Sequence, residues 1–366
     1  MTLIEQHETY NGDAELKVGE VLVLSDELVS DIENHPYFRR MVRVGDESDL
    51  DPERKASFND FANHAEKLLV DNPEWKRTII RQKTKEVIIA EDNLAARWLY
   101  LDNEGNPTQM MDWAKDFPTA IALEPLQRLE RGGRRLEKGH LDERTLELFT
   151  YMIDAIGIRS RAHIYAQRLV ELADNVDGPL SIISVGSGAA VPNIEATLKV
   201  EALQGKYVNW QFFDLDPNAL AFAHELIEEA KFEKSAVEYG PVSMDTEAKW
   251  HFEGRSYEAA FEAPNESVDV VDALGLWEYL RDGDAEDFAR ELYAKVKSGG
   301  MMIISNMLVG RPQSDFNKRG VGWPPLVRRS EEDLIRVLTK AGIDSRNITM
   351  THAQDGVYVV VEIQKP

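Results

Sequence analysis

The sequence contains no cysteine. Disulfide bonds, thiolate nucleophiles and cysteine-based zinc sites are therefore excluded. The sequence also has no apolar run that approaches the roughly 18 residues needed by a membrane-spanning helix. Residues 1–8 show neither the basic stretch nor the apolar stretch of a secretory signal peptide. From these absences we expect a cytoplasmic protein.

Basic residues are few relative to acidic ones: 42 Lys and Arg stand against 65 Asp and Glu, for a net charge of −23 at pH 7. A surface this negative repels phosphate backbones and anionic lipids, so we expect neither nucleic acid nor a membrane as a partner. The eight histidines show no spacing typical of metal ligands. We therefore expect no metal site.

The length of 366 residues suggests two domains, since a domain has roughly 150 residues. Residues 1–140 are expected to form a mostly helical cap or accessory domain, because apolar residues recur at helical spacing between charged ones. Helices are expected over residues 57–70, 74–100 and 118–129. Helical periodicity continues over residues 142–174, where Gly157 is expected to break or kink the helix.

After residue 179 the pattern changes to short apolar runs that alternate with helical segments, which indicates an α/β protein with a parallel sheet. Strands are expected over residues 181–185, 208–213, 268–273, 301–307, 348–352 and 357–363. Helices are expected from 192 onward, over 217–232, over 284–296 and from 330 to 342. The last two strands flank Asp355-Gly356, a turn signal that predicts a C-terminal antiparallel hairpin. We expect the second domain to cover residues 141–366.

The sharpest local feature is a glycine turn, Gly186-Ser187-Gly188, which follows the apolar run Ile182 to Val185 and precedes a helix expected from Pro192. Gly186 permits a tight turn, and Gly188 lets a ligand approach the backbone without a Cβ in the way. The free N–H groups at the start of the helix favour a polar or anionic ligand. From this motif alone, a simple turn that binds no ligand is expected equally.

An acidic residue, Asp214, ends the next strand. In a doubly wound sheet the carboxyl end of this strand lies beside the glycine turn, where a carboxylate can accept both hydroxyl protons of a ribose. Capping of the following helix is the alternative role, although Asp216 suits it better because Pro217 follows at a first-turn position. Three features disfavour the nicotinamide fingerprint. Val191 occupies its third small position, and the acidic residue comes later than the roughly 20 residues expected after the turn. The expected C-terminal hairpin is also unlike the purely parallel sheet of that fold.

In combination, these motifs resemble those of the class I S-adenosylmethionine-dependent methyltransferases. Val185 to Gly188 resembles their first motif, and Phe213 to Pro217 resembles their acidic second motif. Val268 to Leu280 is similar to the strand that opens on the acceptor pocket, and Leu292 to Asn306 is similar to the helix, loop and strand that follow. The resemblance covers residues 160–366 and implies an α/β, Rossmann-like methyltransferase sheet with a C-terminal antiparallel hairpin.

The resemblance also implies which residues hold the cofactor, S-adenosylmethionine (SAM), and its product S-adenosylhomocysteine (SAH). The glycine turn would line the methionine portion, Asp214 would hold the ribose hydroxyls and Leu215 would pack against adenine. An acidic residue beside the adenine amine is expected after the third strand, where Asp245 is the candidate. The floor under the sulfonium would be formed by Asp272, Ala273 and Leu274.

Three further residues are candidates beside this cofactor site. Arg161, on the helix before the first strand, is expected either to pair with the cofactor carboxylate or to lie on an exposed helix face. Glu278 and Tyr279 follow the motif at which acceptors bind in the family, so they are the candidate catalytic residues. A general base is needed only if the acceptor is a hydroxyl or an acidic carbon, and Glu278 or a histidine would then serve.

The function that the resemblance implies is methyl transfer from SAM to a small-molecule O, N or C nucleophile. The N-terminal region would cap the acceptor site, and a homodimer is a further expectation. Three alternatives stay open: a methyltransferase that acts on a protein, a non-catalytic relative that binds the cofactor for regulation, and an oxidoreductase that binds NAD.

Overall fold

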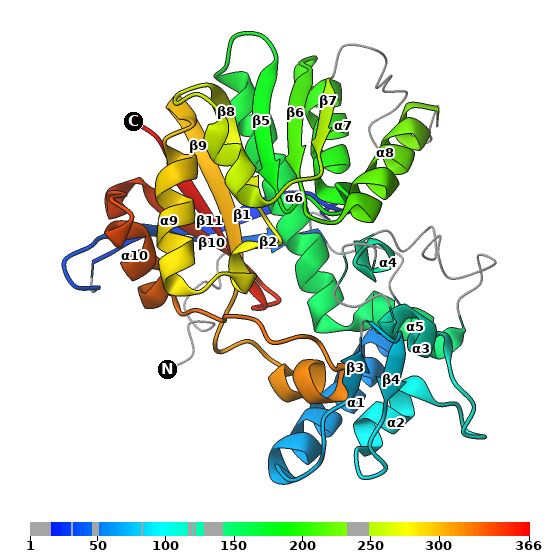
Figure 1. The fold of residues 1–366 in the computed structure, drawn as a ribbon. Coiled ribbons are helices and arrows are strands. Elements are labelled where there is room, and N and C mark those ends of the chain that lie inside the picture. The colour runs from blue at the N-terminus through cyan, green and yellow to red at the C-terminus, as the bar shows by residue number, and fades with distance from the viewer. Residues whose placement is uncertain are drawn as a thin grey trace.

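The computed structural model describes residues 16–30, 32–45, 51–81, 83–115, 119, 122–127, 142–232 and 249–366. At its centre these residues form a nine-stranded sheet in the order β1-β2-β10-β11-β9-β8-β5-β6-β7 (Figure 1). The strands are β1 (Val21–Val29), β2 (Tyr37–Val44), β5 (Leu180–Val185), β6 (Val208–Phe213), β7 (Trp250–Glu253), β8 (Val268–Ala273), β9 (Val296–Met307), β10 (Ile348–Ala353) and β11 (Tyr358–Gln364). A separate two-stranded sheet consists of β3 (Ile79–Arg81) and β4 (Glu86–Ile88).

Strands β5 to β9 are parallel to one another, and β11 runs antiparallel to both of its neighbours, β9 and β10. The order places β6 and β8 on either side of β5, so the direction of winding reverses there and the carboxyl ends of these strands form a crevice. The hairpin predicted from Asp355-Gly356 is confirmed. The sheet is therefore Rossmann-like with the reversed strand β11 that the resemblance implies, and the edge strand β1 is reversed as well.

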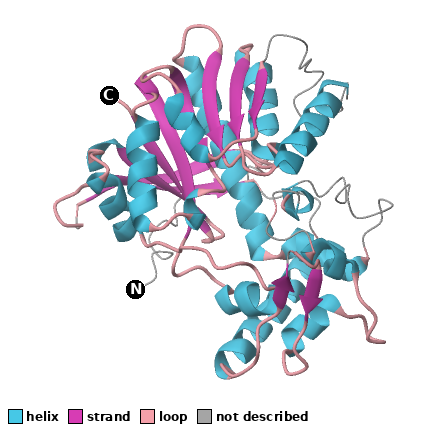
Figure 2. Ribbon diagram, in the orientation of Figure 1, coloured by secondary structure: helices cyan, strands magenta, loops and turns pink. Residues whose placement is uncertain are grey.

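Helices cover both faces of the main sheet and give three layers (Figure 2). On one face lie α6 (Ile153–Asp174), α7 (Val191–Gln204) and α8 (Pro217–Phe232), and on the other lie α9 (Asp282–Tyr293) and α10 (Glu331–Lys340). Alternate side chains of β5 serve the two faces: Leu180 and Ile182 pack with the first group, and Ile183 and Val185 with the second. A strand buried on both faces needs a continuous apolar run, which is why this strand was predictable.

The N-terminal part of the chain is not uniformly helical. Strands β1 and β2 form a hairpin, and β2 pairs with β10, so residues 21–44 extend the main sheet. The helix predicted over residues 74–100 is wrong for most of its length, because it contains β3, β4 and only one short helix, α2 (Leu94–Tyr100). The other helices of this part are α1 (Pro52–Asp71), α3 (Gln109–Ala114), α4 (Glu124–Gln127) and α5 (Glu143–Tyr151). The domain boundary near residue 140 stays a prediction.

Gly157 does not break the helix in which it lies. The interruption falls at Met152, between α5 and α6, where ψ is 129°. Gly157 lies inside α6, where an added Cβ would be 2.8 Å from the Cβ of Val357 and 3.1 Å from a ring carbon of Tyr358. The glycine therefore permits close packing of α6 at the start of β11. Of the helix predicted over residues 118–129, the described residues contain α4, while residues 118, 120, 121, 128 and 129 lie outside them.

Helices α1 to α5 and the β3–β4 sheet form a lobe with a hydrophobic core of its own, in the lower part of Figure 1. The segment of residues 308–329, between β9 and α10, enters this lobe and contains the short helix η6 (Phe316–Val321). Phe316 and Trp323 are buried in the lobe core. Arg319 donates to the carbonyl oxygens of Leu69, Asn72 and Trp75, near the end of α1. The lobe is thus built from two distant parts of the chain.

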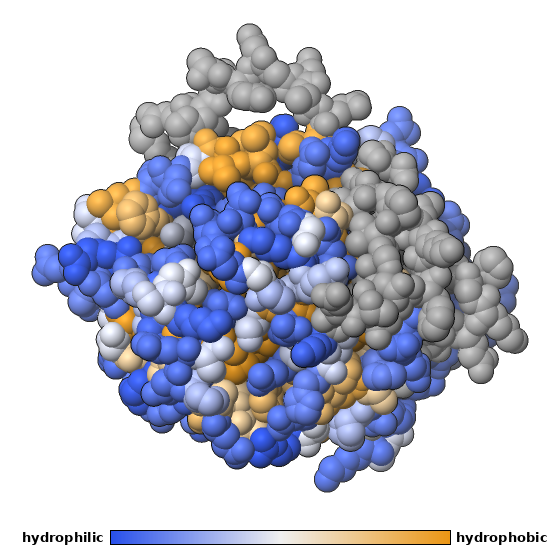
Figure 3. All heavy atoms as spheres, turned by 90° about the horizontal axis from the view of Figure 1, so that it is seen from above, coloured by the Kyte–Doolittle hydropathy of each residue, from blue (hydrophilic) through white to orange (hydrophobic). Residues whose placement is uncertain are grey.

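Seen from above, the surface of the described residues is mostly hydrophilic, with hydrophobic patches between the hydrophilic residues (Figure 3). In the described ranges, no helix combines the length and the apolar character that crossing a membrane requires. Within these same ranges, no group of three or more histidine, aspartate or glutamate side chains is arranged to hold a metal ion.

Candidate functional site

A cavity of about 620 Å³ lies at the carboxyl ends of β5, β6 and β8. This is the crevice created by the strand order, where ligands bind in open α/β sheets. Its walls come from the turn after β5, the start of α7, the loops after β6 and β8, and the N-terminal lobe. Its volume is within the roughly 300–1,000 Å³ that small-molecule sites occupy.

Most of the residues predicted to bind the cofactor line this one cavity. They are Arg161, Gly186, Ser187, Gly188, Asp214, Leu215, Asp272 and Leu274. Tyr279, one of the two candidate catalytic residues, lines it as well, whereas Glu278 does not. Ala273 is buried in the core among side chains that face α9 and α10, so it is not part of the cavity floor. Asp245 lies outside the described residues.

The glycine turn after β5 has a backbone conformation that favours glycine. Gly186 and Gly188 have φ angles of 63° and 58°, in the left-handed region. A Cβ at Gly186 would come within 2.9 Å of the Cβ of Leu276, so the turn also packs closely on the loop after β8. The Oγ atom of Ser187 is buried without a hydrogen-bond partner in the described part of the chain. A polar ligand in the cavity would satisfy this hydroxyl.

Asp214 lies beside this turn, as the topology predicts. Its Oδ2 atom accepts a hydrogen bond from the Gly188 N–H at 2.8 Å, and its Oδ1 atom accepts one from the Asp216 N–H at 2.9 Å. Burial raises the pKa of Asp214, and these two donors partly offset that rise. Because a carboxylate can accept about four hydrogen bonds, Asp214 has lone pairs left for ligand hydroxyls. Asp216 has the expected capping role, since it accepts from the Asn218 N–H at 3.0 Å.

Asp272 belongs to β8, lines the cavity and is 2% exposed. Its Oδ1 atom accepts from the Ser184 hydroxyl at 2.8 Å, and its Oδ2 atom accepts from the Tyr165 hydroxyl at 2.6 Å. The Asn193 amide nitrogen lies 3.2 Å from Ser184 Oγ and 3.4 Å from Asp272 Oδ2. Burial raises the pKa of Asp272 to about 7, against the opposing effect of the Tyr165 and Ser184 donors.

The sequence did not predict the three donors around Asp272. They come from three elements, α6, β5 and α7, and no motif marks them. Tyr165 carries one signal that could have found it: it lies four residues after Arg161 on α6, a spacing that puts two side chains on the same helix face.

Arg161 is a buried cation in the cavity wall. It is 4% exposed, so the alternative of an exposed helix face is wrong. Its Nη1 atom donates to Ser305 Oγ at 3.3 Å, and the guanidinium lies over the ring of Tyr358, 4.5 Å from the ring centroid. Its Nε atom is buried without a hydrogen-bond partner among the described residues. A buried, incompletely paired guanidinium attracts an anionic ligand.

Glu278 is buried behind the cavity wall and near this guanidinium. Burial raises the pKa of Glu278 to about 7, while the charge of Arg161 opposes that rise. Its Oε2 atom has no hydrogen-bond partner in the described part of the chain. Tyr279, in contrast, is 42% exposed and faces the cavity. Of the two candidate catalytic residues, Tyr279 is therefore the one placed to touch a bound molecule.

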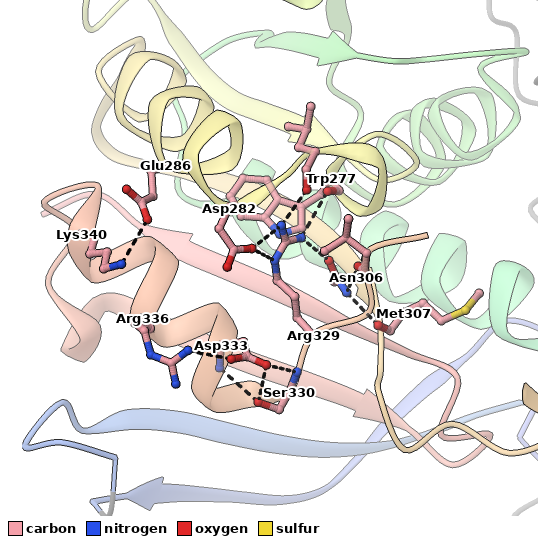
Figure 4. A network of polar contacts seen from close by, with 12 residues as sticks. Trp277, Asp282, Glu286, Asn306, Met307, Arg329, Ser330, Asp333, Arg336 and Lys340 are labelled. Atoms are coloured by element: carbon pink, nitrogen blue, oxygen red, sulfur yellow. Dashed lines mark hydrogen bonds and ion pairs between the residues drawn. The ribbon is translucent and has the colours of Figure 1, made fainter. Parts of the chain in front are cut away.

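The loop after β8 is held in place by Arg329, which lies shortly before α10 (Figure 4). Arg329 is 1% exposed and donates to the carbonyl oxygens of Trp277 and Leu280 at 3.4 and 2.7 Å. The same guanidinium donates to Asn306 Oδ1 at 3.0 Å and to Asp282 Oδ1 at 2.9 Å. These bonds tie the loop to β9 and α9, so this wall of the cavity is preorganised.

The N-terminal lobe contributes a wall of the same cavity. Leu123 and Gln127, which flank and end the short helix α4, line it together with Thr119. The cavity is thus shared between the lobe and the main sheet.

No protein-family model matches the chain, and no curated protein is significantly similar to it in sequence. Solved structures match its fold. A structure described as a possible exported protein from Bordetella parapertussis matches with a TM-score of 0.54 at 14% identity, over 87% of this chain and 99% of that chain. The magnesium protoporphyrin IX methyltransferase from Synechocystis PCC 6803, with bound SAH, matches with a TM-score of 0.41 at 15% identity, over 67% of this chain and 99% of that chain. The N-methyltransferase NodS from Bradyrhizobium japonicum WM9 matches with a TM-score of 0.34 at 12% identity, over 56% of this chain and 95% of that chain.

These similarities concern the fold. The parallel sheet with its switch point and the reversed strand β11 define the class of the fold, which is Rossmann-like. The Rossmann-like sheet that the resemblance implies is confirmed.

Proposed function

We propose that the protein transfers a methyl group from SAM to an O, N or C nucleophile of a small molecule. One observation carries this proposal: the glycine turn and Asp214 meet in a single cavity at the switch point of the sheet. The turn permits close approach of a ligand to the backbone, and Asp214 supplies the acceptor that a pair of ribose hydroxyls needs.

The residues present fit this cofactor. Asp214 would hold the ribose hydroxyls, and Leu215, which is 70% exposed, would cover a face of adenine. The glycine turn leaves space for the methionine portion, next to the unpartnered hydroxyl of Ser187. When bound, the cofactor supplies a methyl carbon that positive sulfur already activates.

The chain's own contribution to such a transfer is positioning and the exclusion of water. The loop after β8 presents Tyr279 to the cavity, and the lobe adds Leu123 and Gln127 to the lining. We infer that the acceptor binds between these walls. A small acceptor is favoured over a protein because a cavity of about 620 Å³ has to hold both the cofactor and the acceptor. A cytoplasmic location and a homodimer stay predictions.

The proposal is tested by incubating the protein with methyl-labelled SAM in two mixtures, a pool of small metabolites and a protein extract. We expect label in the small-molecule fraction, above a control with heat-inactivated protein. Label confined to proteins would instead indicate a protein-directed enzyme. SAH binding without any transfer of label would indicate a non-catalytic role, and either result would contradict the proposed reaction.

A further inference from the structure

The lobe wall of the cavity is formed by a short segment that has two different faces. Thr119, Leu123 and Gln127 line the cavity and follow one another at a spacing of four residues. Ala122 and Leu126, also four residues apart, are buried in the lobe core. In a helical turn, residues four apart lie on the same face. One face of this segment is therefore anchored in the lobe, and the other is presented to the cavity.

A buried arginine of α6, Arg159, is bonded to this segment. Arg159 is 7% exposed, and its Nη1 atom donates to the carbonyl oxygen of Leu126 at 2.9 Å. The same guanidinium donates to the carbonyl oxygens of Phe149 and Thr150 at 3.1 and 2.7 Å. It thus joins the short helices α4 and α5 to α6, which lies beside both of them (Figure 1).

The three carbonyl oxygens all lie near the ends of helices. Leu126 precedes the last residue of α4, and Phe149 and Thr150 lie in the last turn of α5. The last four carbonyl groups of a helix have no partner within it, and the extended ψ of 129° at Met152 keeps the hydrogen-bond pattern of α5 from continuing into α6. A guanidinium supplies donors to such carbonyls, and its charge is favourable at the carboxyl end of a helix. Arg159 therefore caps two helices with one side chain.

We propose that Arg159 is a positioning residue for the methyl acceptor: by capping α4 it fixes Leu123 and Gln127 against the acceptor in the cavity. Arg159 itself is not part of the cavity lining, so it acts through α4 and not on the acceptor. Leu123 offers an apolar contact, and the amide of Gln127 offers both donors and an acceptor of hydrogen bonds. The described lining residues of the lobe are uncharged, so this wall suits an uncharged part of the acceptor. This inference rests on the proposed function.

The dependence of methyl transfer on acceptor concentration provides the first test. Label from methyl-labelled SAM is measured over a dilution series of a small-metabolite pool, so that the half-saturating pool concentration reports acceptor binding. Arg159→Met removes all three hydrogen bonds and should raise this concentration at least tenfold, because a displaced wall no longer orients the acceptor. Calorimetric titration should give an SAH affinity within twofold of that of the unmodified protein, since the glycine turn and Asp214 belong to other elements.

Arg319→Met is the matched control. Arg319 also donates to three carbonyl oxygens near a helix end, those of Leu69, Asn72 and Trp75, and none of these residues lines the cavity. Its substitution should weaken the lobe as the loss of Arg159 does, and should leave the half-saturating pool concentration unchanged. A purely structural role of Arg159 would give the same kinetic result in both variants, which would contradict the assignment.

A conservative variant provides a test of rescue. Arg159→Lys keeps the charge and three donors but loses the planar fork of the guanidinium. It should restore part of the acceptor binding that Arg159→Met loses. Circular dichroism establishes the fold of each variant, and if Arg159→Met does not fold, Arg159→Lys and Arg319→Lys provide the same comparison.

Amide hydrogen exchange tests the capping of α4 apart from the reaction. In Arg159→Met the amides of residues 122–127 should exchange faster than in the unmodified protein, because the bond to the Leu126 carbonyl is lost. The amides of β5 should keep their slow exchange, since this strand lies in the centre of the sheet. In Arg319→Met the exchange of residues 122–127 should stay unchanged.

Faster exchange of residues 122–127 together with a raised half-saturating pool concentration would support the positioning role. If folded Arg159→Met reaches half-saturation at the same pool concentration as the unmodified protein, or loses SAH affinity to the same extent as acceptor binding, the positioning role is overturned while the proposed function stands. Unchanged exchange of residues 122–127 would also overturn it. If the unmodified protein transfers no label to any small molecule, the proposed function itself fails, and the positioning role fails with it.

Discussion

At the scale of single residues, the cavity places carboxylates in two different environments. Asp214 accepts from backbone N–H groups at the edge of the cavity, whereas Asp272 accepts from side-chain hydroxyls in a deeply buried position. Burial raises the pKa of both, and that of Asp272 reaches about 7. The charge of Asp272 therefore changes within the physiological range of pH.

The affinity for SAH should consequently depend on pH through Asp272. A ligand ammonium favours the deprotonated carboxylate, so affinity should fall as the pH drops below about 7 and level off above it. The groups in contact with Asp272 are hydroxyls and an amide, which do not titrate in this range. Titrations of the unmodified protein and of Asp272→Asn from pH 5.5 to 8.5, a range of about 1.5 units on either side of this pKa, provide the measurement. Equal pH dependence in the two proteins would rule out Asp272 as the source.

Gly188→Val should abolish SAH binding, because a branched side chain would enter the cavity at the turn. The matched control is Gly205→Val: Gly205 has a φ of 61°, close to the 58° of Gly188, but an added Cβ there meets nothing within 4 Å. Both variants should lose about 1–2 kcal/mol of stability from the left-handed backbone. Only Gly188→Val should lose binding in a calorimetric titration, and normal binding by it would reduce Gly188 to a turn residue.

At the scale of elements, a buried ion pair joins α6 to the segment between β9 and α10. Arg311 and Asp154 are paired, with the Nη2 to Oδ2 contact at 2.8 Å, and their side chains are 0% and 4% exposed. Asn317, from η6, also donates to Asp154 at 2.9 Å. These contacts fix the lobe against the helix that carries Arg161 and Tyr165.

Asp154→Asn should lower the free energy of unfolding by about 3–5 kcal/mol, because it leaves the Arg311 charge buried without its partner. Asp344→Asn is the control, since Asp344 pairs with Arg346 at the surface and its loss should have little effect. Urea denaturation measures both. Equal losses in the two variants would show that the buried pair has no special role.

At the scale of elements, some strands could be predicted from the sequence and others could not. Strands β5, β6, β8, β9, β10 and β11 are predictable because their apolar runs are bounded by turn residues. Strands β1 and β2 mix apolar and charged residues. The apolar run Val21 to Leu24 is followed by Asp26 and Glu27, which lie opposite Arg40 and Arg39, and the edge position of β1 tolerates this polarity. Around β3 and β4 the apolar residues recur at a spacing like that of a helix. Tertiary contacts override this local preference, and the residues form strands instead.

The residues of the candidate site likewise fall into those that the sequence predicts and those that it does not. Gly186, Gly188 and Asp214 are predictable because the backbone conformation and the end of a strand fix their roles. Tyr165 and Asn193 are not, because they reach Asp272 only through the packing of α6 and α7 on the sheet. Contacts made through such packing leave no spacing in the sequence.

At the scale of the whole molecule, the described residues among the first 140 are part of the fold. They supply β1 and β2 to the sheet and most of the lobe core, which also contains Phe316, Trp323 and Tyr358. They also line the cavity through Leu123 and Gln127. This part of the cavity lining therefore depends on a region that lies far from the glycine turn and Asp214 in sequence.

A protein that begins at Leu141 should accordingly not fold as a stable unit. It would uncover the edge of β10 and the lobe-facing sides of Phe316 and Trp323, which are 0% and 6% exposed in the full chain. Thermal unfolding followed by circular dichroism should show a lost or strongly lowered transition relative to the full chain. A transition at the temperature of the full chain would mean that the lobe and the first two strands are dispensable.

The central claim is that the cavity holding Gly188 and Asp214 binds the SAM cofactor, and calorimetric titration of SAH and NAD into the unmodified protein and Asp214→Ala tests it most directly. The unmodified protein should bind SAH and not NAD. Asp214→Ala, while folded, should bind SAH at least tenfold more weakly, about 1.4 kcal/mol or more, because a hydrogen bond to a charged group is worth about 1.5–3 kcal/mol. Binding of NAD in place of SAH, or SAH affinity unchanged by the substitution, would contradict the claim.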